Sequence, residues 1–331
     1  MVRLLFTCLC LASLFSMTVE EKLGQMLMVH FRGQEINDDA RRLMDEAHVG
    51  GFIYYNCFNG ALPMQTVQSL SSDLQKYSQC FLLIAVDQEG GRVQRLKKGF
   101  THMPPPCRMD NPYEMGRVVG RELKAAGVNL NLAPVVESYL GDRSQKEAQW
   151  FIDGMQQSGI LACAKHYPGH GKKTIDSHFG LPVTEKLAPF PIGSADLVMT
   201  AHVLVPSVDP NFCATLSKIW INRLRKKFHG VVITDSLPMA GVLQNAKNLK
   251  RAAHLAIEAG VDILLFGGTQ LVGSSTIEAL DPEELIDLHR SLVEDVRAGI
   301  LDETLIDCAV ARIQKLKAQL QTRTEYGKSK T

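Results

Sequence analysis

Short apolar segments alternate with amphipathic segments along most of the chain. Eight apolar runs of four to seven residues are bounded by turn-forming residues and predict β-strands. The predicted strands are Gln25–Phe31, Gly51–Tyr55, Phe81–Val86, Leu130–Ala133, Leu161–Ala164, Leu197–Ala201, Val231–Thr234 and Asp262–Leu265.

Between and after these strands, apolar residues recur at the spacing of one helix face. The predicted helices are Asp38–Ala47, Met64–Tyr77, Tyr113–Ala126, Lys146–Ser158, Ser217–Lys227, Leu249–Ala259, Pro282–Ala298 and Glu303–Leu320. Asn111–Pro112 and Gly127 supply start and stop signals for the third helix, and Asp281 is a candidate N-cap for the seventh.

Strands that alternate with helices are typical of a parallel α/β fold. Eight such strands in 331 residues fit a single (β/α)8 TIM barrel. The Pro-rich segment Thr184–Ala195 shows little helical period, which indicates a barrel that lacks the helix after strand five. Since no linker or internal repeat interrupts the pattern, residues 18–331 are expected to form one catalytic domain.

The first 17 residues do not fit this pattern. Arg3 precedes an apolar core, Leu4–Phe15, which is too short to span a bilayer and has the size of a signal-peptide core. Two interpretations stay open: export, to the periplasm or beyond, if Met1–Ser16 is a signal peptide, and a cytoplasmic protein whose true start is Met17. No other stretch has the length and apolarity for stable membrane insertion.

Composition narrows the possible partners. The formal net charge is +1, with acidic and basic residues mixed along the chain, so nothing indicates nucleic-acid binding. A small or neutral partner is favoured. The eight cysteines form no paired CxxC motif and are interpreted as mostly free thiols.

Polar residues stand where several predicted strands end. Asp87 follows the third strand, Lys165 and His166 the fifth, His202 the sixth and Asp235 the seventh. In a (β/α)8 barrel the chemistry lies at the carboxyl ends of the strands, so these side chains are expected at one mouth. Any one of them alone could be a helix cap or a core residue, but a shared register favours a site.

The segment Ala164–His178, AKHYPGHGKKTIDSH, has the glycines and proline of a long irregular loop, and such loops inside compact domains are usually functional. Asp176 and His178 are close enough for the carboxylate to accept a hydrogen bond from the imidazole. This pair predicts a general acid/base near neutral pH, although an Asx-turn beside an exposed histidine fits the same residues.

The chain from Val19 to Leu320 resembles family 3 glycoside hydrolases of the β-N-acetylhexosaminidase branch, including those that recycle peptidoglycan. The resemblance rests on six motifs in the family's order: VDQEGGRVQR at Val86–Arg95, NLAPV at Asn131–Val135, GDRS at Gly141–Ser144, the KHYPGHG–DSH loop, AHV at Ala201–Val203, and ITDSLPM at Ile233–Met239.

This resemblance implies retaining hydrolysis of terminal β-linked N-acetylglucosamine, in glycans such as muropeptides, with no metal or organic cofactor. It implies that Asp235 is the nucleophile, His178 the acid/base and Asp176 its dyad partner. The substrate-binding positions that it implies are Asp87, Arg95, Arg143, Lys165 and His166. The residue types fit these roles, because a retaining mechanism needs a carboxylate on one side of the anomeric carbon and a proton donor on the other.

Two segments are shorter than the family normally has. Gln145–Trp150 is compressed, so Arg143 is expected to lie differently from its place in the family, and Leu181–Asp196 is short. Subsites beyond the first sugar depend on such loops, and the oligomeric state stays open.

Two alternatives have distinct signatures. A metal-dependent barrel hydrolase would use His166, His170, His178, His202, Asp176 and Asp235. However, His166 and His170 are four apart on a Gly/Pro loop and not on a helix face. A non-catalytic barrel that binds cell-wall sugar would have lost the nucleophile or the dyad, and Asp235, Asp176 and His178 are all present.

Overall fold

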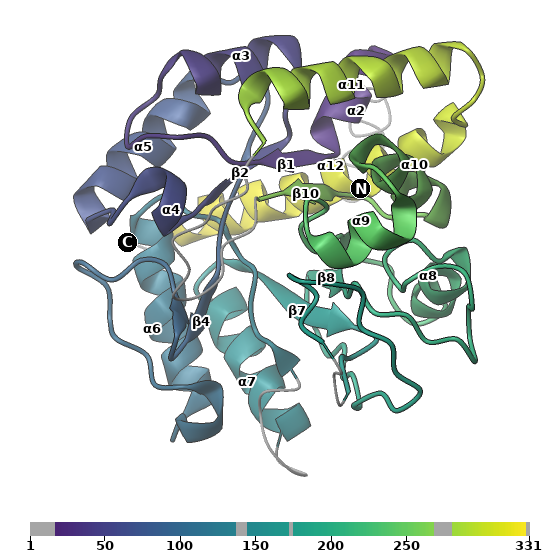
Figure 1. Ribbon diagram of the computed structural model, residues 1–331. Coiled ribbons are helices and arrows are strands. Elements are labelled where there is room, and N and C mark those ends of the chain that lie inside the picture. Colours follow the sequence, from purple (N-terminus) through teal and green to yellow (C-terminus); the bar gives the residue numbers. More distant parts are fainter. Residues whose placement is uncertain (1–16, 137–143, 172–174, 268–279, 329–331) are drawn as a thin grey trace, which may run out of the picture.

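The computed structural model of the chain describes residues 17–136, 144–171, 175–267 and 280–328 (Figure 1). Its centre is a sheet of eight parallel strands in the order β10-β1-β2-β3-β6-β7-β8-β9. The strands are β1 (Leu27–Val29), β2 (Gly51–Tyr54), β3 (Leu83–Val86), β6 (Leu130–Asn131), β7 (Leu161–Tyr167), β8 (Leu197–Thr200), β9 (Val231–Ile233) and β10 (Leu264–Phe266).

The sheet closes on itself. β1 pairs with β10 in parallel, Leu27 opposite Leu264, and a parallel bridge between Ile233 and Ile263 joins β9 to the start of β10. The single (β/α)8 barrel predicted from the sequence is therefore confirmed, and each predicted strand contains or overlaps an observed one.

Helices surround the barrel (Figure 1). They are α3 (Asp38–Glu46), α5 (Met64–Tyr77), α6 (Pro112–Ala125), α7 (Ser144–Gln157), α8 (Lys218–Arg225), α10 (Leu249–Ala259), α11 (Pro282–Arg297) and α12 (Glu303–Lys328). The predicted caps are present, since Asn111 accepts a bond from Glu114 N and Asp281 from Glu284 N. Among the described residues no helix lies between β7 and β8, as expected for the missing barrel helix.

Several short elements did not come from the periodicity. α2 (Val19–Gln25) takes in Gln25, which was predicted as the start of the first strand, because Thr18 and Glu21 form a capping box that begins a helix there. The others are α4 (Asn56–Asn59), α9 (Ala240–Ala246), the 3-10 turn η1 (Pro106–Arg108) and the hairpin of β4 (Gln88–Gly90) and β5 (Val93–Gln94).

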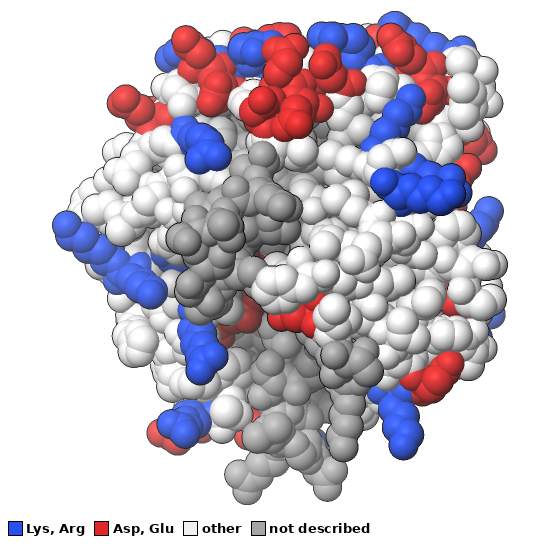
Figure 2. Space-filling model, in the orientation of Figure 1, with Lys and Arg blue, Asp and Glu red and all other residues white. Residues whose placement is uncertain are grey.

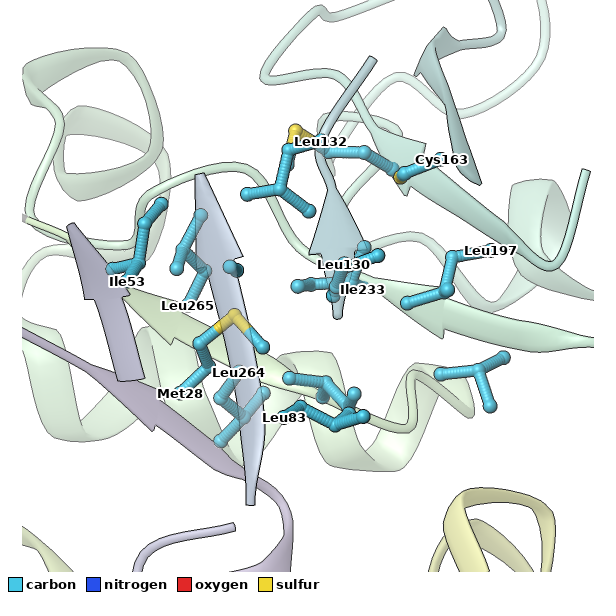
Figure 3. Close-up of a cluster of buried hydrophobic side chains, with 14 of the residues drawn as sticks. Met28, Ile53, Leu83, Leu130, Leu132, Cys163, Leu197, Ile233, Leu264 and Leu265 are labelled. Carbon is cyan, nitrogen blue, oxygen red and sulfur yellow. The ribbon is translucent and has the colours of Figure 1, made fainter. Parts of the chain in front are cut away.

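Apolar side chains from the strands fill the core. Figure 3 shows Met28, Ile53, Leu83, Leu130 and Ile233 close together, each from a different strand. All five are at most 1% exposed. Such packing makes the barrel a rigid mount, so side chains at the strand ends are held in fixed positions.

Helix α12 contacts the end of the barrel where the strands begin. Arg312 of α12 and Arg225 both pair with Asp262, which is fully buried before β10. Lys317 donates to Gln25 Oε1 at 2.7 Å and to the carbonyl of Gly50 at 3.1 Å. These bonds fix α12 at the end opposite the predicted active site.

The segment interpreted as signal-like lies outside the described residues. Within the described part of the chain, no helix combines the length and apolarity needed to cross a membrane. The six cysteines described there, Cys57, Cys80, Cys107, Cys163, Cys213 and Cys308, are all free thiols.

Candidate active site

Three of the predicted strand-end positions meet in one ion cluster. Lys165, near the end of β7, donates to Asp87 Oδ1 at 2.7 Å and to Glu89 Oε1 at 2.6 Å. The side chain of Lys165 is 4% exposed, so these contacts lie in a poorly solvated environment. The cluster holds both carboxylates at the end of the barrel where β3 and β7 end.

Burial and charge act in opposite directions on this cluster. Burial alone would raise the pKa of Asp87, but the charges of Lys165 and Arg95 outweigh it and lower that pKa below its usual range. Burial raises the pKa of Glu89 despite the same cation. Burial would lower the pKa of Lys165, but Asp87 and Glu89 together raise it, so the ammonium stays charged.

The β4–β5 hairpin presents this cluster. Arg95 follows β5, and its Nε lies 3.9 Å from Asp87 Oδ2. The Arg95 guanidinium lies over the Tyr55 ring, 5.4 Å from its centroid, and its backbone carbonyl accepts a bond of 2.7 Å from Asn56 Nδ2. Bonds between the hairpin and the loop after β2 therefore fix the direction of the arginine.

Glu89 was not among the predicted site residues, although the sequence carried a signal for it. In an extended chain, residues two apart point to the same side, so Glu89 follows Asp87 toward Lys165. The quoted motif around Asp87 contains it.

Asp235 lies two residues after β9, recessed with 17% of its side chain exposed. Its Oδ1 accepts the amide N–H of Ser236 at 2.8 Å. Its Oδ2 lies 3.9 Å from His166 Nε2. One oxygen is thus fixed by the backbone, while the other faces the histidine from the end of β7.

Asp176 and His178, which were predicted to form a dyad, are in contact. Asp176 Oδ1 lies 2.8 Å from His178 Nδ1 and also accepts the backbone N–H of His178 at 3.0 Å. The side chains of Asp176 and His178 are 53% and 31% exposed, so the dyad sits on an open loop while Asp235 is recessed. The carboxylate of Asp176 contacts Nδ1 and not Nε2.

The loop that carries Asp176 and His178, called the dyad loop, contacts the chain that follows Asp235. The amide of Gly241 in α9 donates to the carbonyl of Ser177 at 2.9 Å. The charges of His178 and Asp235 both act on His202, so the loop and the end of β9 belong to one electrostatic neighbourhood.

His202, at the end of β8, is a structural member of the site. Nε2 lies 2.9 Å from the Ser236 carbonyl and Nδ1 lies 2.9 Å from Thr215 Oγ1. Burial lowers its pKa, so the ring is neutral. A carbonyl can only accept, so Nε2 carries a proton and donates it to the Ser236 carbonyl. The imidazole of His202 therefore holds the backbone of Ser236, the residue next to Asp235, in place.

The remaining predicted positions divide clearly. The structure brings Asp87, Arg95 and Lys165 together, places His166 beside Asp235, and joins Asp176 to His178. Arg143 lies outside the described residues. No group of three or more histidines, cysteines and carboxylates arranged to hold a metal ion occurs in the part of the chain that the structure describes.

The visible face of the molecule carries both signs of charge. Figure 2 shows blue and red side chains mixed along its rim, densest over α3 and α11, and a few acidic atoms recessed in the middle of the face.

Comparison with known proteins places this geometry among carbohydrate-active enzymes. The family model described as the glycosyl hydrolase family 3 N-terminal domain matches residues 18–316. A beta-hexosaminidase of Alkalilimnicola ehrlichii is 34% identical over 80% of this chain and 86% of that protein. One of Neisseria meningitidis is 33% identical over 69% of this chain and 73% of that protein.

Solved structures agree. A family 3 beta-N-acetylglucosaminidase of Paenibacillus superimposes with a TM-score of 0.81 at 33% identity, covering 92% of this chain. This chain spans 63% of the length of that one. A beta-N-acetylhexosaminidase of Beutenbergia cavernae gives a TM-score of 0.79 at 25% identity over 92% of this chain and 99% of that one.

Proposed function

The chain belongs to glycosyl hydrolase family 3, and from this premise we propose that it is a retaining β-N-acetylhexosaminidase that releases terminal β-linked N-acetylglucosamine. The chain is a glycoside hydrolase. The names of its relatives support the choice of sugar, and the two separated functional groups, Asp235 and the Asp176–His178 dyad, support the retaining mechanism.

In the first step, Asp235 Oδ2 attacks the anomeric carbon, since Oδ1 is held by the Ser236 amide. The bond from that carbon to the leaving oxygen breaks, and protonated His178 gives its Nε2 proton to this oxygen. The products are the free alcohol and a glycosyl ester on Asp235.

In the second step, neutral His178 takes a proton from water at Nε2, and the resulting hydroxide attacks the same carbon. The ester bond breaks and Asp235 returns as a carboxylate. Two inversions give overall retention. Throughout, Asp176 Oδ1 accepts a hydrogen bond from the Nδ1–H of His178, with 2.8 Å between the two atoms. This bond fixes the tautomer and stabilises the charged imidazole.

The ion cluster suits recognition of the sugar itself. Asp87 is an ionised carboxylate held in place by Lys165, so it can accept hydrogen bonds from sugar hydroxyls in fixed geometry. Arg95 and His166, directed to the same mouth, can donate to the remaining oxygens. These contacts would orient the anomeric carbon toward Asp235.

The observation that carries this proposal is the 2.8 Å Asp176–His178 contact on an open loop, paired with a recessed carboxylate at a strand end. The test compares a good leaving group, 4-nitrophenol, with a poor one, methanol, both as β-N-acetylglucosaminides. A good leaving group needs little protonation, so His178→Ala should slow the methyl glycoside far more.

Asp235→Ala should abolish turnover of both substrates, and His229→Ala supplies the matched control, because His229 is an exposed histidine that precedes β9. Equal losses on both substrates in His178→Ala would remove the acid role. Full activity in Asp235→Ala would remove the nucleophile assignment.

We propose muropeptides as the natural substrates, following the resemblance to enzymes that recycle peptidoglycan. The comparison to make is kcat/KM on an N-acetylglucosaminyl muropeptide against kcat/KM on a chitooligosaccharide of equal length. A preference for the muropeptide supports this assignment, and a preference for the chitooligosaccharide opposes it.

A further inference from the structure

Helix α9 and the dyad loop are joined by two hydrogen bonds that lie on either side of His178. On one side, the Gly241 amide donates to the Ser177 carbonyl at 2.9 Å. On the other, Gln244 Oε1 accepts the backbone N–H of Leu181 at 2.9 Å. Both contacts are made to the loop backbone, so they fix its path directly.

The first contact requires the absence of a side chain. A Cβ on Gly241 would lie 2.8 Å from the Gly180 carbonyl oxygen and 2.9 Å from the Ser177 carbonyl oxygen. Both distances are shorter than real Cβ contacts, and both neighbours are backbone atoms that cannot rotate away. Glycine at position 241 therefore lets the helix backbone meet the loop backbone.

The two apolar side chains next to the dyad are largely exposed. Ile175 and Phe179, the apolar residues that flank the dyad, are 41% and 61% exposed. Because these two side chains bury little apolar surface, they contribute little hydrophobic packing beside Asp176 and His178. The backbone contacts with α9 carry a correspondingly larger share of the loop's placement.

The docking helix also follows the nucleophile directly. α9 begins at Ala240, five residues after Asp235, and the link is fixed by bonds from Leu237 N to the Leu265 carbonyl at 2.9 Å and from Met239 N to the Ser236 carbonyl at 3.2 Å. One short, bonded segment therefore carries the nucleophile at one end and the platform of the acid/base loop at the other.

We propose that Gly241 and Gln244 are positioning residues that hold the dyad loop at a fixed position relative to Asp235. This inference rests on the roles proposed above for His178 and Asp235. The proposed role needs no contact between either residue and the sugar. Weakening the dock lowers the fraction of molecules in which His178 reaches the leaving oxygen, and sugar binding in the ion cluster is unaffected.

The test variant is Gln244→Ala, because Gln244 is exposed and its loss leaves the core intact. For the methyl glycoside we expect kcat/KM to fall about fivefold, the effect of one hydrogen bond. For the 2,4-dinitrophenyl glycoside, whose 2,4-dinitrophenolate leaves without protonation, we expect no change in kcat/KM. Gln244→Glu keeps the acceptor oxygen and should restore the rate, and Gln68→Ala, an exposed glutamine on α5, is the matched control.

Gly241→Ala should act in the same direction but more strongly, by about tenfold or more, because the clash displaces the whole loop. Combining Gln244→Ala with His178→Ala separates the dock from the chemistry. Without the acid, losing the dock should cost nothing further on the methyl glycoside.

An equal loss on both substrates in Gln244→Ala, no loss on either, or a further loss in the double variant would overturn the docking role. If His178→Ala itself lost activity equally on both substrates, the acid assignment would fail first, and the docking inference would fail with it.

Discussion

Replacing Lys165 with methionine removes the cation between two largely buried carboxylates and keeps a side chain of similar length. In the native cluster the ammonium lies 2.7 Å from Asp87 Oδ1 and 2.6 Å from Glu89 Oε1. Without it, the nearest described cation to Asp87 is Arg95, at 3.9 Å. The variant therefore confines two negative charges that face each other with little solvent.

Breaking a buried ion pair by removing one partner typically destabilises a protein by about 3–5 kcal/mol. A chain of this length loses about 2 °C of Tm per kcal/mol, so the expected fall in Tm at pH 7 is roughly 6–10 °C. Lys97→Met, at an exposed lysine, is the control and should change Tm by less than about 1 °C.

The pH dependence distinguishes this mechanism from simple loss of packing. In the native protein the pKa of Asp87 is lowered, so its contribution to stability is present above the unfolded pKa and is lost as pH falls through the folded one. In Lys165→Met both carboxyl pKa values rise above their unfolded values, and that sign reverses. The variant should recover stability relative to the native protein as pH falls from about 7 to about 5.

Thermal unfolding across this pH range is the assay, with Lys165→Met/Glu89→Gln as a partner variant. Removing one of the two facing charges should recover about half of the loss. A destabilisation under about 1 kcal/mol that does not vary with pH would show that the cluster is solvated and would refute this reasoning.

Three further predictions follow from other parts of the molecule. His202→Phe leaves the Ser236 carbonyl without its donor and should lower kcat/KM about tenfold equally for good and poor leaving groups; a loss confined to poor ones would show that the ring serves the acid instead. Burial lowers the pKa of Lys317 to about 8, so the folded state resists charging it, and stability should rise with pH between about 8 and 10 by up to about 3 kcal/mol. Lys317→Met should flatten that rise, and an unchanged slope in thermal unfolding would contradict the assignment. Activity should survive dialysis against a strong chelator, because the proposed chemistry needs only a carboxylate and a proton donor; activity lost on dialysis and restored by zinc would favour the metal-dependent alternative.

The barrel could be predicted from the sequence because its strands are short apolar runs that must be buried together. Periodicity placed helices such as α5 and α10 at their observed bounds. It missed α2 and α9, since seven residues give too few turns for a helical period to show against the neighbouring apolar residues. Thr18 and Glu21 carried a signal for α2, and that signal was the cap.

The candidate site could be predicted where its residues are close in sequence or stand at strand ends. Asp176 and His178 are two residues apart, and Asp87, Lys165 and Asp235 mark strand ends that any parallel barrel brings together. Contacts between distant segments left no local pattern. The hydrogen bond from the Gly241 amide to the Ser177 carbonyl joins residues 64 positions apart. No sequence pattern around either residue predicts this contact.

Asp235 is the proposed nucleophile, and trapping the covalent intermediate tests this role most directly. A 5-fluoro N-acetyl-β-glucosaminyl fluoride reacts quickly in the first step because fluoride leaves well, and its ring fluorine slows the second. Mass spectrometry of the treated, digested protein should find one added sugar on the peptide that contains Asp235, and no label in Asp235→Ala. Inactivation without that label, or a label on another carboxylate, would contradict the account.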